Sequence, residues 1–333
     1  MDRRAFLAAS AALLATPAFA AGDMPPRIRR LSPKLDRILA PDAQIETIAT
    51  NIRWAEGPVW VKKGGYLLFS DPPANIMRRW KRGEAISVFL SPSGAGGTDP
   101  KLVREPGSNG LAIDHGGRLV MANSGGRSLD RIDLATKART VLVDRYKGKR
   151  FNSPNDVHIA RSGAIYFTDP PYGFTDGDSS PLKELPHNGV YRWTPGGEAV
   201  LIDGSLGRPN GVALSPDERR LYISNSEEQK PHIMVYDLDA KGMPTGRRIF
   251  QDFGATPGPG LPDGMKIAAD GTMFCSGPGG MYIFTPEGEK LGRIEDGAAI
   301  ANCAFGEGGT ALYMTSSDRV LRLPLRFNAE RRG

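Results

Sequence analysis

The chain has 333 residues, of which 40% are hydrophobic, with 41 glycines, 27 prolines and a formal net charge of +6. This composition is far from that of a disordered or collagen-like chain and fits many short strands joined by turns. The lysines and arginines are scattered and are not interleaved with aromatic residues, which argues against a nucleic-acid interface and for a solvated basic surface.

Residues 1–20 have the features of a cleavable export signal. A charged start containing Arg3-Arg4 is followed by a short Ala/Leu run and by Ala18-Phe19-Ala20, a small-residue cleavage site. The paired arginines resemble a twin-arginine signal, which implies export after folding. The apolar run is too short to span a bilayer, so we expect a periplasmic or secreted protein and take a retained membrane anchor as the alternative.

Residues 21–43 are expected to form a linker, because this segment contains prolines and the only local cluster of basic side chains. From residue 44 onward a repeat dominates the chain. Each copy opens with a short oxygen-bearing side chain, followed by a strand, a turn and a second strand, roughly every 50 residues. The opening residues are Glu56, Asn109, Asn155, Asn210, Asp263 and Asn302.

This period is typical of a propeller blade, so the repeat predicts one all-β domain, a six-bladed β-propeller over residues 44–327, followed by a tail at 328–333. The sixth repeat ends after its third strand, Arg319–Leu323. Its missing outer strand is predicted at Ile45–Ala49, which would close the ring by joining both ends of the chain in one blade.

Closure of the ring would bring the six opening side chains to one end of a central channel. Four of them, Glu56, Asn155, Asn210 and Asp263, offer an oxygen-only ligand set of the kind Ca²⁺ prefers. We expect one divalent cation there, with Zn²⁺ or Mn²⁺ as alternatives to Ca²⁺. An Asn-Gly or Asp-Gly pair alone is a common turn signature, so this prediction depends on the whole set.

A second set of polar residues directly follows the second strands, and a hairpin returns these positions to the end where it began. Asp71, Asp169 and Asn225 are therefore predicted to orient the ligands or to brace the blades. The loop at residues 91–106 and the insertion at 176–188 are expected to border the site. The four histidines show no metal-binding spacing, and the sequence has no G-x-S-x-G motif, which argues against zinc and serine hydrolases.

Five motifs in register closely resemble those of the SMP-30/gluconolactonase/regucalcin-like family, over residues of about 45 to 325. They are Glu56-Gly-Pro-Val-Trp60, Arg150-Phe-Asn-Ser-Pro-Asn-Asp156, Phe167-Thr-Asp-Pro-Pro-Tyr-Gly173, Arg208-Pro-Asn-Gly-Val212 and Leu261-Pro-Asp-Gly-Met265. The resemblance implies a six-bladed propeller with one divalent cation held by Glu56, Asn155, Asn210 and Asp263.

The resemblance further implies hydrolysis of a gluconolactone-like sugar lactone to the aldonic acid. Water would attack a carbonyl polarised by the cation, and Asp263 would serve both as ligand and as general base. The sequence departs from the animal relatives at Ser153, where they carry a pocket arginine. Candidates for the substrate contacts are Asn109, Arg150, Asn152, Asp156, Tyr172 and His187.

Two alternatives to this function stay open. One is a non-catalytic propeller that binds a sugar or a partner through the same mouth, and the other is a related lactonase or phosphotriesterase. The preferred lactone, the native metal and the oligomeric state are not specified by these residues. Cys275 and Cys303 are expected as small buried side chains, although an exported chain permits a disulfide.

Overall fold

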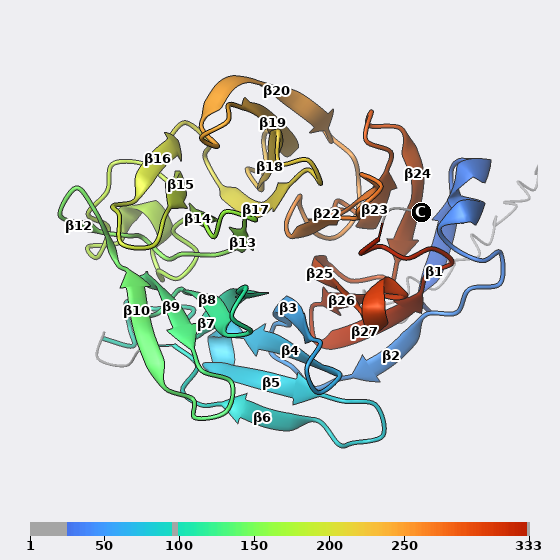
Figure 1. Ribbon diagram of the computed structural model, residues 1–333, viewed down its shortest axis with the longest axis horizontal. Helices are drawn as coiled ribbons and strands as arrows, with labels where there is room; N and C mark the ends of the chain where they lie inside the picture. Colours follow the sequence, from blue (N-terminus) through green and yellow to red (C-terminus); the bar gives the residue numbers. More distant parts are fainter. Residues whose placement is uncertain (1–24, 95–98, 332–333) are drawn as a thin grey trace, which may run out of the picture.

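The computed structural model describes residues 25–94 and 99–331, and within them six antiparallel sheets surround a central axis (Figure 1). The all-β, six-bladed propeller predicted from the repeat is thereby confirmed. The expected export signal at residues 1–20 lies outside the described residues. Among the described helices none is long and apolar enough to cross a membrane.

Four blades have four strands in chain order from the axis outward, while blade 5 has a fifth strand and blade 6 takes its outer strand from the start of the chain. The inner strands are β3 (Glu56–Val61), β7 (Ser108–Ile113), β13 (Val157–Ile159), β17 (Pro209–Leu214), β21 (Met265–Ile267) and β25 (Ile300–Gly306). The second strands are β4 (Tyr66–Asp71), β8 (Leu119–Asn123), β14 (Ile165–Asp169), β18 (Arg220–Asn225), β22 (Met273–Gly277) and β26 (Ala311–Ser316).

The third strands are β5 (Ile76–Trp80), β9 (Ser128–Ile132), β15 (Gly189–Trp193), β19 (His232–Leu238), β23 (Gly280–Phe284) and β27 (Arg319–Pro324). The outer strands are β6 (Ser87–Leu90), β10 (Arg139–Val143), β16 (Val200–Asp203), β20 (Pro244–Asp252), β24 (Lys290–Glu295) and, from the chain start, β2 (Glu46–Ala49). A small hairpin, β11 (Arg145–Tyr146) and β12 (Lys149–Arg150), joins blades 2 and 3. Short 3-10 turns are η1 (Pro33–Arg37), η2 (Pro72–Ala74), η3 (Gly177–Ser179) and η4 (Glu307–Gly309).

The ring closes as predicted, because β2 pairs antiparallel with β27 and completes blade 6. The expected linker at 21–43 differs from the structure. Arg27–Arg30 forms β1, a fifth strand paired with the outer edge of β24, and η1 follows it. The edge of β24 offers unpaired backbone groups, and even a polar segment can satisfy them by adding a strand.

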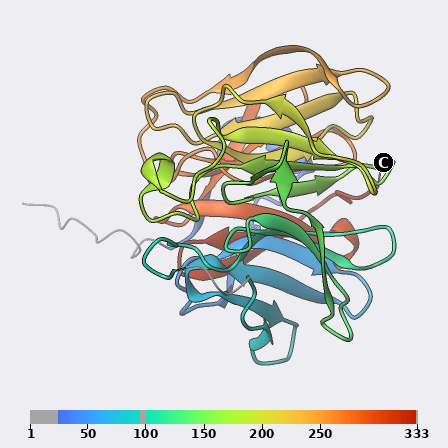
Figure 2. The same cartoon turned by 90° about the vertical axis from the view of Figure 1, so that its left-hand side faces the viewer.

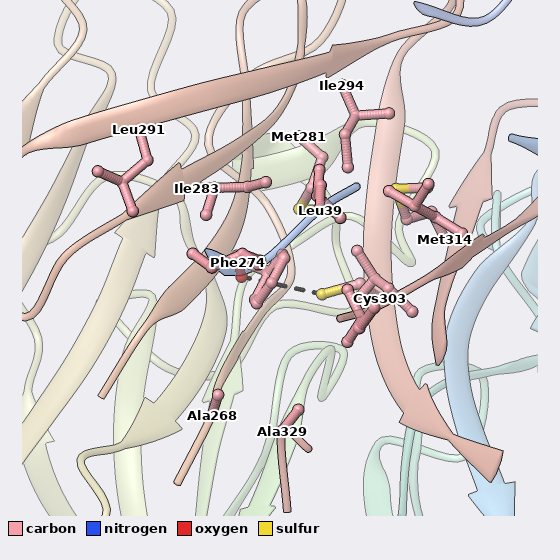
Figure 3. Packing of buried hydrophobic residues seen from close by; sticks show 14 of the residues in the cluster. Leu39, Ala268, Phe274, Met281, Ile283, Leu291, Ile294, Cys303, Met314 and Ala329 are labelled. Carbon is pink, nitrogen blue, oxygen red and sulfur yellow. Dashed lines mark hydrogen bonds between the residues drawn. The ribbon is translucent and has the colours of Figure 1, made fainter. Parts of the chain in front are cut away.

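The core lies between blades, where the second strands are almost wholly buried and rich in aromatic and branched side chains. In side view the blades form stacked layers of antiparallel strands (Figure 2). Figure 3 shows one cluster between blades 5 and 6, in which Leu39 from the N-terminal segment and Ala329 from the expected tail meet Phe274 and Met314. Both terminal segments are therefore part of the domain.

Both cysteines are buried in this ring and unbonded to each other, in agreement with the expectation. Cys303 belongs to the cluster of Figure 3, and Cys275 packs between blades 4 and 5. Burial raises the pKa of the Cys303 thiol to about 12, so it acts as a small apolar side chain.

Candidate cation and substrate site

The opening residues of the repeats lie where the inner strands begin, and local irregularities turn them toward the axis. The pairing of β3 with β4 shifts register between Glu56 and Val59, and that of β17 with β18 shifts between Pro209 and Val212. Such a bulge bends the strand and redirects its side chains, and bulges are common beside functional sites.

Glycine after an opening residue lets neighbouring blades approach closely. Gly57 has φ 45°, and a Cβ there would lie 1.9 Å from the Asn109 carbonyl oxygen of the next blade. A Cβ at Gly211 would lie 2.2 Å from the Asp263 carbonyl oxygen. The Asn-Gly and Asp-Gly pairs therefore do more than make turns, since they allow the ring to contract around the axis.

The four predicted ligands all line one cavity of about 870 Å³ at one end of the axis. Glu56, Asn155 and Asn210 are between 3% and 5% exposed, and Asp263 is partly buried. They come from blades 1, 3, 4 and 5 and are distant from one another in the sequence. Closure of the ring therefore brings them together. Asn302 stays out of the wall, because its buried side-chain oxygen accepts the N–H of Cys303 at 2.8 Å.

The carboxyl groups of this cavity destabilise one another's charges. Burial raises the pKa of Glu56 to about 8, and the charges of Asp156 and Glu105 add to this effect. Burial, followed by the charges of Glu56 and Asp156, raises the pKa of Asp263 well above its ordinary value. Burial also raises the pKa of Glu105 to about 7. A bound divalent cation would favour the ionised forms of these carboxyl groups and so lower their pKa values again.

The donor atoms fit a hard divalent cation. Asn210 Oδ1 is buried without a hydrogen-bond partner among the described residues, while its Nδ2 donates to Ser226 Oγ at 3.0 Å and so fixes the amide. Two carboxylates would neutralise a 2+ charge, and two amides bring the side-chain set to four residues. Water or substrate would complete the six to eight oxygens that Ca²⁺ takes. Across the described ranges no group of three or more His, Cys, Asp or Glu side chains offers another metal cluster.

Two of the six predicted substrate contacts lie in the cavity wall. Asn109 is only 3% exposed and faces the cavity from blade 2. Tyr172 also lines the cavity, from the loop after β14, and its hydroxyl is buried without a partner in the described part of the chain. Burial, and with it the charge of Asp263, raises the Tyr172 pKa well above its ordinary value, so the phenol stays protonated and can donate a hydrogen bond.

Three other candidates for substrate contacts lie outside the described cavity wall. Asn152 is fully buried, and its Nδ2 donates to the carbonyl oxygens of Asp169 and His187, both at 3.0 Å. His187 Nε2 lies 2.8 Å from the hydroxyl of Tyr191. Arg150 donates to the Gly126 carbonyl oxygen at 2.6 Å. These side chains support the blade 2 and blade 3 loops and have no face toward the cavity.

Asp156 is also displaced from the wall, although it directly follows Asn155. Its carboxylate is 2% exposed and accepts the N–H groups of Val157 at 2.9 Å and Val212 at 3.1 Å. Successive side chains of an extended chain point in opposite directions, so only one of the two neighbours can face the cavity. Asp156 instead links blades 3 and 4 beneath the site.

The three residues predicted to orient the ligands or to brace the blades hydrogen-bond to neighbouring loops and not to the four candidate ligands. Asp71 accepts the N–H groups of Arg53 and Trp54, both at 3.3 Å, and Trp54 lines the cavity. Asn225 Oδ1 accepts the Arg208 N–H at 2.9 Å, and Arg208 also lines the cavity. Asp169 accepts the Asn152 N–H at 2.8 Å and braces blade 3.

Much of the outer wall comes from loops and was not predicted residue by residue. The loop residues include Trp54, Arg104, Glu105, Arg208, Glu227, Glu228, Gln229 and Leu261, and Ile300 at the start of β25 lies beside them. Arg104 and Glu105 belong to the loop at 91–106 that was expected to border the site. The insertion at 176–188 supports the wall from outside, because Asp178 pairs with Arg208 at 2.5 Å.

Fold and site together define a six-bladed propeller with an axial cavity lined by carboxylate and amide oxygens. The chain belongs to the SMP-30/gluconolactonase/LRE-like family, whose model matches residues 54–318. It is 50% identical over 307 residues to a gluconolactonase from Zymomonas mobilis subsp. mobilis, covering 89% of this chain and 85% of that protein.

Solved structures agree with this membership. A gluconolactonase from Xanthomonas campestris superimposes with a TM-score of 0.78 at 32% identity, covering 91% of this chain and 96% of that chain. A calcium-binding protein, regucalcin, from Agrobacterium tumefaciens superimposes with a TM-score of 0.67 at 18% identity, covering 87% and 98%, and shows the shared fold.

Proposed function

We propose that the chain is a cation-dependent lactonase that hydrolyses a gluconolactone-like sugar lactone to the aldonic acid. The observation that carries the proposal is the convergence of Glu56, Asn155, Asn210 and Asp263 on one cavity. Their donor set favours Ca²⁺. The gluconolactonase relatives from Zymomonas mobilis and Xanthomonas campestris support the substrate class.

When bound, the cation would supply a positive charge that polarises a lactone carbonyl and stabilises negative charge on its oxygen. The chain's own residues then have distinct tasks. Asp263 takes a proton from water, the water oxygen bonds to the carbonyl carbon, and the ring C–O bond breaks as the ring oxygen gains a proton. Asn109 and Tyr172 would bind the substrate's hydroxyl groups, which is supported by their position in the cavity wall.

Asp263 works as a base mainly through its position. A neighbouring cation lowers the pKa of a carboxylate, so the basicity of Asp263 alone would be modest in the loaded site. A base held within hydrogen-bond reach of the attacking water compensates for this, since positioning contributes strongly to proton transfer.

The test compares Asp263→Asn with the wild type in a pH-stat assay of D-glucono-lactone hydrolysis, with Ca²⁺ added and after chelation. We expect the variant to lose about 100-fold or more in kcat, the loss typical of removing a general base. Asp270→Asn, in the turn between β21 and β22, is the matched control because its carboxylate only accepts local bonds from Thr272. Full activity of Asp263→Asn, or chelator-resistant turnover, would contradict the proposal.

The proposal includes export to the periplasm, for which the sequence of residues 1–20 is the support. N-terminal sequencing of the mature protein from the periplasmic fraction should give a chain beginning near Ala21. Replacing Arg3 and Arg4 by lysine should leave the precursor in the cytoplasm. A full-length, unprocessed chain in the wild-type cytoplasm would contradict export.

A further inference from the structure

A set of buried hydroxyl groups lies on the second strands, next to the backbone of the residues that open the repeats. Five of the six second strands carry serine or threonine at the residue before last. All five side chains are fully buried. They are Ser70, Thr168, Ser224, Ser276 and Thr315.

Two of these hydroxyls join consecutive ligand-bearing blades. Thr168 in blade 3 accepts the N–H of Asp156, the residue after Asn155, at 3.1 Å and donates to the carbonyl oxygen of Asn210 at 2.5 Å. Ser224 in blade 4 accepts the N–H of Gly211, the residue after Asn210, at 2.7 Å and donates to the carbonyl oxygen of Asp263 at 2.8 Å. The backbones of three of the four candidate ligands are thus tied in series by two side chains.

Only a hydroxyl can make this connection at so small a site, because it donates and accepts at a single oxygen. The bonds are buried, so removing the hydroxyl leaves an N–H and a carbonyl group without partners and lets the two blades shift relative to one another. Asp263 is held at its other end as well, since its N–H donates to Ser276 Oγ at 2.9 Å. Its peptide is therefore fixed from both blade 4 and blade 5.

We propose that Thr168 and Ser224 are positioning residues that set the spacing of Asn155, Asn210 and Asp263 for cation binding. The inference rests on the proposed cation site and assigns these hydroxyls no contact with cation or substrate. It predicts that removing the Thr168 or Ser224 hydroxyl lowers cation affinity more than removing a hydroxyl elsewhere in the ring that contributes equally to stability.

Blade 6 provides the matched comparison. Thr315 occupies the same strand position, is equally buried, and bonds both the N–H and the carbonyl of Asn302, at 3.1 and 3.3 Å. Asn302 is no candidate ligand, and both of these bonds stay within one blade. Thr315→Val therefore removes a similar pair of buried bonds without releasing any ligand from its neighbour.

The experiment measures Ca²⁺ binding by isothermal titration calorimetry on metal-stripped protein, with thermal unfolding of each variant recorded in parallel. Thr168→Val and Ser224→Ala are expected to bind Ca²⁺ about 10- to 100-fold more weakly, the range typical for residues that orient metal ligands. Thr315→Val should bind Ca²⁺ with an affinity within about threefold of wild type. Its Tm should nevertheless fall by about as much as that of Thr168→Val and Ser224→Ala. The conservative exchanges Thr168→Ser and Ser224→Thr should restore most of the affinity.

Wild-type affinity in Thr168→Val and Ser224→Ala would overturn the inference, and so would an equal loss in Thr315→Val. A wild-type protein that binds no Ca²⁺ would overturn the proposed cation site itself, and the inference with it. If Thr168→Val does not fold, Ser224→Ala together with its threonine exchange decides the question alone.

Discussion

Glu105 is a further carboxylate in the wall of the cavity that holds Glu56 and Asp263. It belongs to no repeat position, so the periodic pattern could not indicate it. The four candidate ligands were predictable because each opens a repeat, and the ring places equivalent positions at one end of the axis. Arg104, Glu105 and Arg208 lie on loops whose path the pattern does not determine. The pattern also does not tell which of Asn155 and Asp156 faces the cavity, since neighbouring residues of an extended chain face opposite ways.

Glu105 should strengthen cation binding only when it is ionised. Because its pKa is raised to about 7, it is mostly charged at pH 8 and mostly neutral at pH 6. Glu105→Gln should therefore weaken Ca²⁺ binding at pH 8 by about 1 kcal/mol, or roughly fivefold, and should change it little at pH 6. Calorimetric titrations at both pH values check this, with the exposed Glu287→Gln as control. An equal effect at both pH values would contradict the electrostatic explanation.

At the scale of strands and turns, the sequence pattern predicts strands best where their residues are most buried. The second strands β4, β14 and β26 are almost wholly buried and carry the aromatic and branched residues that favour strands. β20 is a nine-residue strand although most of its residues are exposed, because backbone pairing with β19 continues through polar residues that carry no strand-like pattern. β1 was missed for the same reason, since Arg27–Arg30 has no strand-like pattern and becomes a strand only by pairing with β24.

The segment before β2 should contribute to the stability of the domain, whereas a linker would contribute nothing. Leu35 in η1 is fully buried in the cluster between blades 5 and 6, over Gly292 of β24. Leu35→Ala should lower the free energy of unfolding by about 2–4 kcal/mol, because it removes buried carbon atoms and leaves a cavity. Urea denaturation measures this change, and Lys34→Ala, which removes an exposed side chain, is the control. An unchanged midpoint in Leu35→Ala would mean that the segment is a dispensable linker.

For the whole molecule, closure of the ring depends on blade 6, where the two ends of the chain meet. An ionic network reinforces this joint. Arg322 on β27 pairs with Glu307 of η4 at 2.5 Å and with Glu46 of β2 at 2.9 Å. The hydrogen bond from Arg322 is the main cause that lowers the pKa of Glu307 from 4.5 to about 2, despite partial burial.

The lowered pKa makes the stability of the ring depend on pH in acid. Glu307 binds protons less readily in the folded than in the unfolded chain, so its contribution is present above about pH 4.5 and is lost as the pH falls toward 2. Arg322→Met should abolish part of this acid-dependent loss, because Glu307 would then titrate closer to its ordinary pKa. Tm measured between pH 6 and pH 3 should fall less steeply in Arg322→Met than in wild type and Arg319→Met, whose partner Asp318 is exposed. Parallel curves in all three proteins would contradict this assignment.

The pairing of β2 with β27 also determines when the domain can finish folding. Glu46 emerges from the ribosome long before Arg319–Pro324 is synthesised, so β2 lacks its partner strand β27 during most of translation. Contacts between residues so distant along the chain form slowly. The final blade can assemble only after β27 has been synthesised, and a nascent chain stalled before β27 would leave the sheet edges of blade 6 open to aggregation or proteolysis.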